Sequence, residues 1–459
     1  MTRISSRIAL CALIFFALTP LTSLFGADEL RLPEVVRFST SNGVTVYYVH
    51  DELPRITVAA LVATGYLYET PEKAGITNLT TRTLSFGGTE DLSGTVLEEK
   101  VDATGSRFSV SPDWESISVS YQALDEFCED AFIVTGGLLS KPAVTQGHFD
   151  LAKQLEKAKI AREGEDPMMA AYLAARGLLF NGTTYGIRPT VASVDACTLN
   201  DVVNNWKKSV CASNVVIGIA SSRPLPEIKI LAEKYFGKIA KGERLRYIVD
   251  VAADRARVRT LSGKVFFMRR DIPQSTVIIL APGADVHDPS ADDLSVADQI
   301  LGGGDFNSRL IREIREKRGL AYGTGSIMRM RNNVGIFMAY AQCESTKTPE
   351  VYSLMKNAID DVAGGNIIPE DTELAKLSMI RSHIFAFDSE LSVLSSYLSL
   401  WYTGLPVDYI TGYAGRIGKT GEKSVSAAFA RLIGDGYVTV ILGREDSVKG
   451  ISGVERIGE

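Results

Sequence analysis

The stretch Arg55-Ile-Thr-Val-Ala-Ala-Leu-Val has a counterpart later in the chain, Gln274-Ser-Thr-Val-Ile-Ile-Leu-Ala. Two further pairs follow in the same order: Leu151-Ala-Lys with Leu374-Ala-Lys, and Val215-Val-Ile-Gly-Ile-Ala with Tyr437-Val-Thr-Val-Ile-Leu. Each pair is separated by about 220 residues, and three ordered matches at one spacing indicate an internal duplication. We therefore predict two homologous halves.

The same order of elements is predicted in each half. Two strands, a helix, two more strands, long helices and a short closing strand follow one another. Strands are predicted at 43–49, 57–63, 107–110 and 116–121, and again at 264–268, 276–281, 323–330 and 335–341, with long helices at 149–163 and 369–387. This order predicts an α+β fold of two α/β sandwich halves, each a mixed sheet with helices on one face.

The predicted domains are residues 28–237 and 265–459. Residues 238–264 between them are rich in charged side chains and lack an apolar face at either the helix or the strand period. We interpret this segment as a linker, partly extended and partly solvated.

Residues 1–27 have the features of a secretory signal. Arg3 and Arg7 precede an apolar run, and Gly26-Ala27 supplies small residues before Asp28. A retained membrane anchor is the alternative, although the run contains polar residues and is marginal for a span of about 20 residues. We expect export, most simply to the periplasm, with no membrane attachment after cleavage. The five cysteines include no C-x-x-C pair, which argues against a redox motif or a cysteine zinc site.

Charge and motif content exclude several classes of function. The net charge of −6 argues against a nucleic-acid binder, which needs a basic face. The four histidines are isolated from one another and no G-x-S-x-G elbow occurs, so a stand-alone hydrolase has little support. The run Leu301-Gly-Gly-Gly-Asp lacks the ending of a phosphate-binding loop and fits a flexible, close-approach loop between helices better.

Several motifs taken together resemble one family of peptidases. They are Gln274-Ser, Leu301-Gly-Gly-Gly, Ser308-Arg-Leu and Ile314-Arg-Glu-Lys-Arg-Gly-Leu-Ala-Tyr322, with a related block at 75–89 in the first half. As a set they resemble the insulinase/pitrilysin zinc peptidases. The resemblance covers nearly the whole chain after residue 27. It implies the metallopeptidase-like fold that LuxS and the processing peptidases share.

The first half departs from the catalytic pattern of that family. Active members carry an inverted H-x-x-E-H motif on the first helix. Here the five positions are Asn78-Leu-Thr-Thr-Arg82, so Asn78, Thr81 and Arg82 replace the two histidines and the glutamate. The resemblance implies a third ligand about 75 residues later, near Glu156 or Glu163, but a lone carboxylate cannot hold zinc. We expect no zinc in this chain.

The second half keeps the other part of the family's site. Arg315 and Tyr322 match an arginine–tyrosine pair that catalytic members use, in which the tyrosine hydroxyl can donate to a developing oxyanion. A surface ion pair of Arg315 with Glu313 or Glu316, and a Tyr322 that only opens a strand, is the structural alternative.

The glycine-rich stretch suggests a role in substrate binding. It lies where the non-catalytic subunit of the mitochondrial processing peptidase carries its substrate loop. The positions concerned are Gly302, Gly303, Gly304, Asn307 and Ser308.

The resemblance implies a non-catalytic subunit, as in that peptidase and in bacterial two-subunit homologues. Its partner would be a zinc-binding homologous subunit carrying H-x-x-E-H, and its substrate an unfolded peptide. A catalytically inert scaffold or peptide-binding homologue is the alternative.

Overall fold

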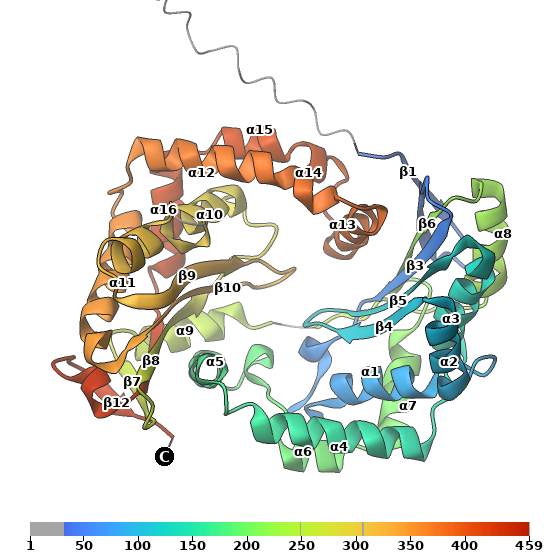
Figure 1. Cartoon of the computed structure of the whole chain (residues 1–459), viewed down its shortest axis with the longest axis horizontal. Helices are drawn as coiled ribbons and strands as arrows, with labels where there is room; N and C mark the ends of the chain where they lie inside the picture. Colours follow the sequence, from blue (N-terminus) through green and yellow to red (C-terminus); the bar gives the residue numbers. More distant parts are fainter. Residues whose placement is uncertain (1–31, 248, 305–306, 459) are drawn as a thin grey trace, which may run out of the picture. The chain divides into compact units, whose positions relative to one another are not determined.

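The computed structural model describes residues 32–247, 249–304 and 307–458, and Leu32–Glu459 forms one compact unit. The predicted signal, residues 1–27, lies outside the described residues. Two six-stranded sheets and many helices make up the fold, so the predicted α+β class is confirmed (Figure 1). None of the described helices is long and apolar enough to cross a membrane.

The first sheet has the strand order β1-β2-β6-β3-β5-β4. Strand β6 pairs in parallel with β2, and the other neighbours pair antiparallel, so the sheet is mixed. Its strands are β1 (Val35–Ser39), β2 (Thr45–His50), β3 (Arg55–Val62), β4 (Arg107–Pro112), β5 (Ile117–Leu124) and β6 (Val215–Ser221).

The second sheet repeats this arrangement in the order β12-β7-β11-β8-β10-β9. Strands β7, β11, β8, β10 and β9 take the places of β2, β6, β3, β5 and β4, with the same parallel and antiparallel pairings. The strands are β7 (Val265–Arg269), β8 (Gln274–Pro282), β9 (Ala321–Arg329), β10 (Ile336–Glu344), β11 (Val438–Gly443) and β12 (Val454–Arg456). The matching orders agree with the duplication inferred from the sequence. Only the edge strands differ, since β1 is antiparallel to β2 whereas β12 is parallel to β7.

Each sheet buries apolar side chains on both faces because neighbouring residues of a strand point to opposite sides. One face packs on helices of the same half, α3 and α8 for the first sheet and α10, α11 and α16 for the second. The helices of the first half and the connecting segment are α1 (Ile76–Gly87), α2 (Gly94–Thr104), α3 (Cys128–Ser140), α4 (Gln146–Arg162), α5 (Pro167–Leu179), α6 (Val191–Ala196), α7 (Leu199–Ser209), α8 (Leu225–Phe236) and α9 (Val251–Leu261). Those of the second half are α10 (Ala291–Asp298), α11 (Thr348–Ala363), α12 (Pro369–Ser382), α13 (Glu390–Thr403), α14 (Asp408–Thr411), α15 (Tyr413–Gly418) and α16 (Glu422–Ile433).

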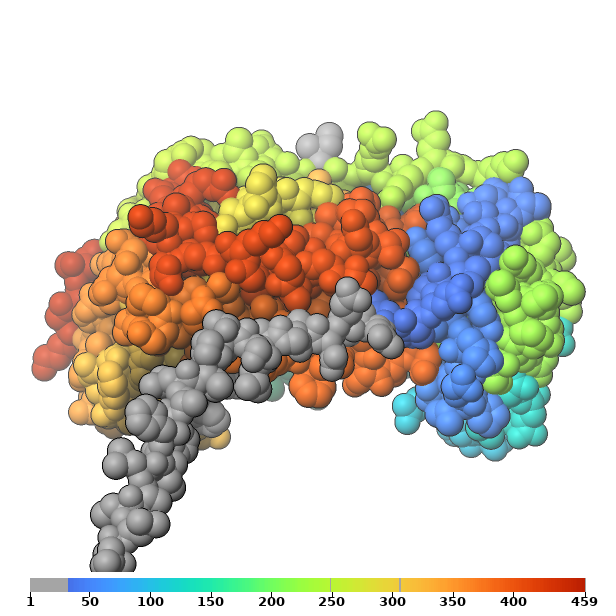
Figure 2. Space-filling model, turned by 90° about the horizontal axis from the view of Figure 1, so that it is seen from above, coloured from blue at the N-terminus to red at the C-terminus, as the bar shows by residue number. Residues whose placement is uncertain are grey.

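The opposite face of each sheet is covered by a helix from the other half. Helix α13 lies on β2 and β6, where Leu394 and Leu398 are buried, and Figure 2 shows orange residues beside blue ones at this contact. The Leu394 and Leu398 side chains pack against Gly218 on β6, where a Cβ would lie 3.4 Å from Leu394. Helix α5 packs in the same way on β8 and β11. The two halves therefore exchange covering helices.

The connecting segment contains a helix that the sequence did not predict. Helix α9 occupies 251–261, and only Asp254 and Val258 of its residues are buried. Two buried positions one turn apart form no apolar stripe, so the hydrophobic periodicity of the sequence does not predict this helix. The domain boundary itself, at residues 238–264, stays a prediction.

Candidate functional site

Helix α1 carries the five positions that correspond to the zinc motif. It begins after Gly75, which has a φ of 99°, a conformation that favours glycine. Backbone N–H groups of Gly75 and Thr77 each donate to the Glu69 carboxylate at 2.9 Å, which places a negative group at the positive end of the helix. Burial raises the pKa of Glu69, and these two hydrogen bonds act in the opposite direction. This cap fixes the start of α1, and so the direction of the side chains that follow.

Asn78 replaces the first expected histidine and makes two hydrogen bonds. Its Nδ2 donates to Oε1 of Glu156 on α4 at 2.6 Å, and its Oδ1 accepts from the hydroxyl of Tyr66 at 2.8 Å. Burial, followed by the charges of Glu69 and Glu156, raises the pKa of Tyr66, so this phenol stays protonated as a donor. The amide therefore satisfies groups on both of its sides.

Arg82 replaces the second expected histidine and supplies a positive charge. Its Nε lies 3.6 Å from Oε2 of Glu156, and Lys159 Nζ lies 3.9 Å from Oε1 of the same carboxylate. The Glu156 side chain is fully buried, whereas about a third of the Arg82 side chain is exposed. A buried carboxylate is costly unless it is paired, and here two cations and an amide surround it. The guanidinium thus neutralises the charge that a metal ion would otherwise balance.

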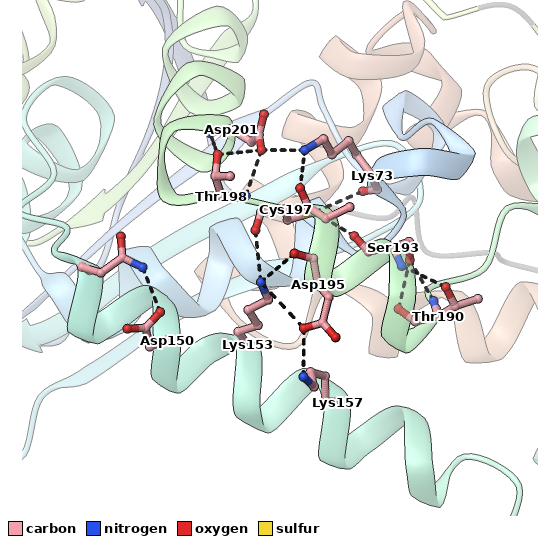
Figure 3. Close-up of polar contacts among 12 residues, drawn as sticks. Lys73, Asp150, Lys153, Lys157, Thr190, Ser193, Asp195, Cys197, Thr198 and Asp201 are labelled. Atoms are coloured by element: carbon pink, nitrogen blue, oxygen red, sulfur yellow. Dashed lines mark hydrogen bonds and ion pairs between the residues drawn. The ribbon is translucent and has the colours of Figure 1, made fainter.

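Helix α4 is also bound to α6 by a polar network (Figure 3). Lys153 Nζ donates to the backbone carbonyls of Asp195 and Cys197 at 2.9 and 3.2 Å, and Lys157 Nζ lies 2.8 Å from the Asp195 carboxylate. These bonds tie α4 to α6 through residues three positions before and one position after Glu156. Helix α4 therefore packs on both α1 and α6, and Glu156 lies on its contact with α1.

The structure decides between the two candidates for the third ligand position. Glu156 faces Asn78 and Arg82, whereas Glu163 lies beyond the end of α4 and pairs with Arg188 at 3.2 Å. Thr81, at the position of the catalytic glutamate, donates its hydroxyl to the carbonyl of Asn78 at 3.1 Å. Among the described residues no group of three or more His, Cys, Asp or Glu side chains could hold a metal ion. The residues at this position do not fit zinc.

In the second half, Tyr322 is the second residue of β9 and points into solvent. Its side chain is 83% exposed, the largest exposure among the described large apolar and aromatic residues. Arg315 is exposed too, in the π-helical turn Ile311–Glu316 that packs on β9. Glu313, one of the alternative partners of Arg315, is bound by Lys317 at 2.6 Å and by Arg318 at 2.9 Å. Tyr322 does open a strand, but its ring contributes nothing to the core.

The glycine-rich stretch lies partly in a π-helical turn, Gln299–Gly303, that continues α10. This corrects the expectation of a loop for Gly302 and Gly303, and the close approach that was expected is confirmed. A Cβ on Gly302 would lie 2.4 Å from the Ser326 nitrogen of β9. Ser308 is buried, while Asn307 is exposed. A role of these positions in substrate binding stays a prediction.

Beneath this turn lies Asp298, which the sequence did not single out. Its carboxylate accepts from the Ser326 hydroxyl at 2.6 Å and from the Met328 N–H at 3.0 Å, both on β9. Burial raises the pKa of Asp298 to about 6. Tyr66 and Glu69 were missed as well. No motif marks these residues, because their roles depend on contacts that only the folded chain creates.

Comparison with known proteins supports the resemblance. Residues 196–379 match the model of the "Peptidase M16 inactive domain". An "Uncharacterized zinc protease" of Rickettsia bellii is 24% identical over 346 residues, which cover 75% of this chain and 81% of the relative. A "Non-peptidase homolog YmxG" of Helicobacter pylori is 22% identical over 344 residues, 74% of this chain and 77% of the relative.

Two solved structures share the fold. A peptidase M16 inactive domain from Pseudomonas fluorescens has a TM-score of 0.80 at 21% identity and covers 90% of this chain and 98% of its own. A protease from Helicobacter pylori has a TM-score of 0.78 at 14% identity and covers 90% of this chain and 100% of its own. At these identities the likeness establishes the fold alone.

Proposed function

We propose that this chain, a homologue of the M16 peptidases, is the zinc-less subunit of a heteromeric zinc metallopeptidase. Its partner is a homologous subunit that carries H-x-x-E-H and the zinc ion. The chain binds unfolded peptides with that partner and contributes Arg315 and Tyr322 to the partner's active site. The substrate backbone adds partly as a strand to a sheet edge, which requires little sequence preference.

One observation carries this proposal: the two parts of the expected site differ in their surroundings, since the α1 position is filled by interacting side chains and Tyr322 is exposed. At the expected metal position on α1, Asn78 donates a hydrogen bond to the buried Glu156, and Arg82 pairs with the same carboxylate at 3.6 Å. In contrast, the Tyr322 phenol projects from the start of β9 with 83% of its side chain exposed. An exposed aromatic donor is available to a second subunit.

The chemistry assigned to each residue is limited. A tyrosine hydroxyl can donate a hydrogen bond to the oxyanion that forms when a metal-bound water attacks a peptide carbonyl. An arginine can hold a substrate carbonyl and orient the peptide. The zinc ion in the partner would supply the activated water.

Affinity purification of this chain from its native host tests the proposal. We expect a homologous chain with an intact H-x-x-E-H motif to co-purify, and the complex to cleave a denatured reporter protein in a chelator-sensitive reaction. This chain alone should cleave nothing. If the zinc-bearing chain cleaves equally fast without it, the inert scaffold replaces the present proposal.

Export is a separate part of the proposal and rests on residues 1–27. The charged start, the apolar run and the small residues before Asp28 support it. N-terminal sequencing of the protein from the periplasmic fraction should give a start near Asp28. An intact Met1 on a protein from the cytoplasm would contradict this part alone.

A further inference from the structure

A groove of about 750 Å³ lies beside α13, separate from the α1–α4 contact of Glu156 and from the start of β9. Helix α13 forms one wall, and the turn His383–Phe387, with α14 and the start of α15, forms the other. The volume lies within the range of about 300–1,000 Å³ typical of ligand sites. None of the residues given a role above lines this groove.

Both walls of the groove have surface that a ligand can reach. On the α13 wall, Ser395 and Ser399 are exposed. On the opposite wall, the ring of His383 stacks on Tyr413 with centroids 4.0 Å apart and meets Phe387 edge-on at 5.0 Å. All three rings are only partly buried. A ligand in the groove would therefore contact accessible side chains on two sides.

The groove carries no formal charge. The fifteen described residues that line it include no aspartate, glutamate, lysine or arginine. Burial lowers the pKa of His383, the one histidine among them, so this ring is neutral at pH 7. A charged group that entered the groove would lose its hydration without gaining an oppositely charged partner. The lining therefore favours an uncharged ligand.

The α13 wall also offers two hydroxyl groups. Ser396 and Thr403 donate their hydroxyls to carbonyls of the same helix, but those of Ser395 and Ser399 have no partner among the described residues. These two serines are one turn apart, a rise of about 6 Å. Alternate residues of an extended peptide repeat at about 6.6–6.8 Å, with their backbone groups on the same side. Both serines can thus bond to the backbone of one extended chain, whereas a hydrocarbon could not use them.

Large apolar side chains are concentrated next to the groove. Phe385 is 74% exposed and Ile384 57% exposed, both in the turn that forms one wall. Leu391 and Val407 are exposed as well. Single exposed apolar residues are ordinary, whereas several around one groove mark an interaction site. These side chains extend the apolar surface that a ligand would contact.

We propose that this groove binds an uncharged, apolar segment of an unfolded polypeptide in an extended conformation. The backbone of the segment bonds to Ser395 and Ser399, and its apolar side chains lie against the aromatic wall. From Leu391 to Thr403 the lining of α13 rises about 18 Å, which corresponds to about five extended residues. The inference rests on the proposed function, because it specifies which part of an unfolded substrate this chain binds.

Peptide binding to the isolated chain tests the proposal. The probe is a capped octapeptide of valine, leucine and serine with a fluorescent dye on a glycine–serine linker. Two companion peptides have lysine or aspartate in place of the two central leucines. By fluorescence anisotropy we expect saturable binding of the uncharged peptide, at least about tenfold tighter than that of either charged peptide, because the groove desolvates a charge without pairing it. No saturable binding, or equal affinity for the three peptides, would overturn the proposal.

Introduced charges on α13 locate the binding. Ser395→Glu/Ser399→Glu should weaken binding of the uncharged peptide at least about tenfold and should make the lysine peptide the preferred ligand. Ser395→Lys/Ser399→Lys should instead prefer the aspartate peptide. Ser353→Glu/Asn357→Glu changes an exposed pair one turn apart on α11, outside the groove, and should bind as the wild type does. Circular dichroism verifies that each variant is folded. Preferences that do not follow the introduced charge would overturn the proposal.

The measurement separates this site from the proposed function. Binding is measured without the zinc-bearing chain, so the groove can bind peptides even if no partner is found. If the uncharged peptide does not bind and Ser395→Glu/Ser399→Glu instead prevents co-purification of the zinc-bearing chain, the groove is a subunit interface. That outcome would overturn the present inference and leave the proposed function standing.

Discussion

Arg82 Nε lies 3.6 Å from Oε2 of Glu156, a carboxylate that is fully buried between α1 and α4. The two residues come from helices that are distant in sequence. Arg82 and Lys159 supply positive charge to this carboxylate. A buried acid is tolerated at this helix pair because cations lie beside it.

Restoring the two histidine ligands and the catalytic glutamate should restore zinc binding. The triple variant Asn78→His/Thr81→Glu/Arg82→His re-creates H-x-x-E-H on α1, and Glu156 already faces the two histidine positions. We expect elemental analysis to find about one zinc per chain in the variant and no stoichiometric zinc in the wild type. The same variant with Glu156→Gln should bind zinc at least tenfold more weakly. Stoichiometric zinc in the wild type would contradict the proposal that this chain is a zinc-less subunit.

Asn78 should contribute to stability through Glu156. Replacing it by alanine leaves Glu156 Oε1 and the Tyr66 hydroxyl without their buried partner, which should lower the free energy of unfolding by about 2–3 kcal/mol. Urea unfolding monitored by circular dichroism measures this. In a double-mutant cycle with Glu156→Gln we expect a coupling of at least about 1 kcal/mol. Additive effects of the two changes would show that the amide and the carboxylate do not interact.

The strands were predictable because their signal is local. The strand pairs and the helices at 149–163 and 369–387 coincide with β2, β3, β7, β8, α4 and the region of α12, since alternation and apolar periodicity express the burial of single elements. The exchange of α5 and α13 was not predictable. It depends on contacts between the halves, for example that of Leu394 with Gly218. The sequence pattern of a helix does not identify the sheet on which the helix packs.

Only part of the candidate site was predictable from the sequence as well. The sequence predicted from Asn78, Thr81 and Arg82 that this position lacks zinc ligands, because a missing ligand is visible without a structure. It left Glu156 and Glu163 as equal candidates, since both lie at a suitable spacing. Only the folded structure distinguishes them, because Glu156 contacts Asn78 and Arg82 whereas Glu163 pairs with Arg188.

The stability of the chain should depend on pH through Asp254. Burial raises the pKa of this α9 carboxyl group from 3.8 to about 6, and its Oδ1 accepts from Thr183 at 2.8 Å. Because the folded state holds the proton more tightly, this group's stabilising contribution is complete below pH 4 and is lost as the pH rises to about 6. Asp254→Asn mimics the protonated side chain.

The variant should therefore be as stable as the wild type at pH 4 and more stable by about 2–3 kcal/mol at pH 7. Urea unfolding at the two pH values gives the comparison. The exposed Asp102→Asn on α2 serves as a matched control and should not gain stability. A gain for Asp254→Asn that is equal at both pH values would rule out titration of this group as the cause.

Tyr322 and Arg315 should affect peptide cleavage by the complex in different ways. Tyr322→Phe removes one hydroxyl from a side chain that is 83% exposed, so folding and partner binding should not change. If that hydroxyl donates to the oxyanion, kcat should fall by about 100-fold with little change in KM. If Arg315 holds the substrate equally in the ground and transition states, Arg315→Ala should raise KM and leave kcat nearly constant.

Tyr352→Phe on α11 is the control for loss of a tyrosine hydroxyl elsewhere. The measurement is steady-state kinetics of the reconstituted complex, with the melting temperature recorded for each variant. Unchanged cleavage by the Tyr322→Phe complex would falsify the oxyanion assignment. A lowered melting temperature without a specific kinetic defect would instead assign both residues to structure, and the chain would then be better described as a scaffold.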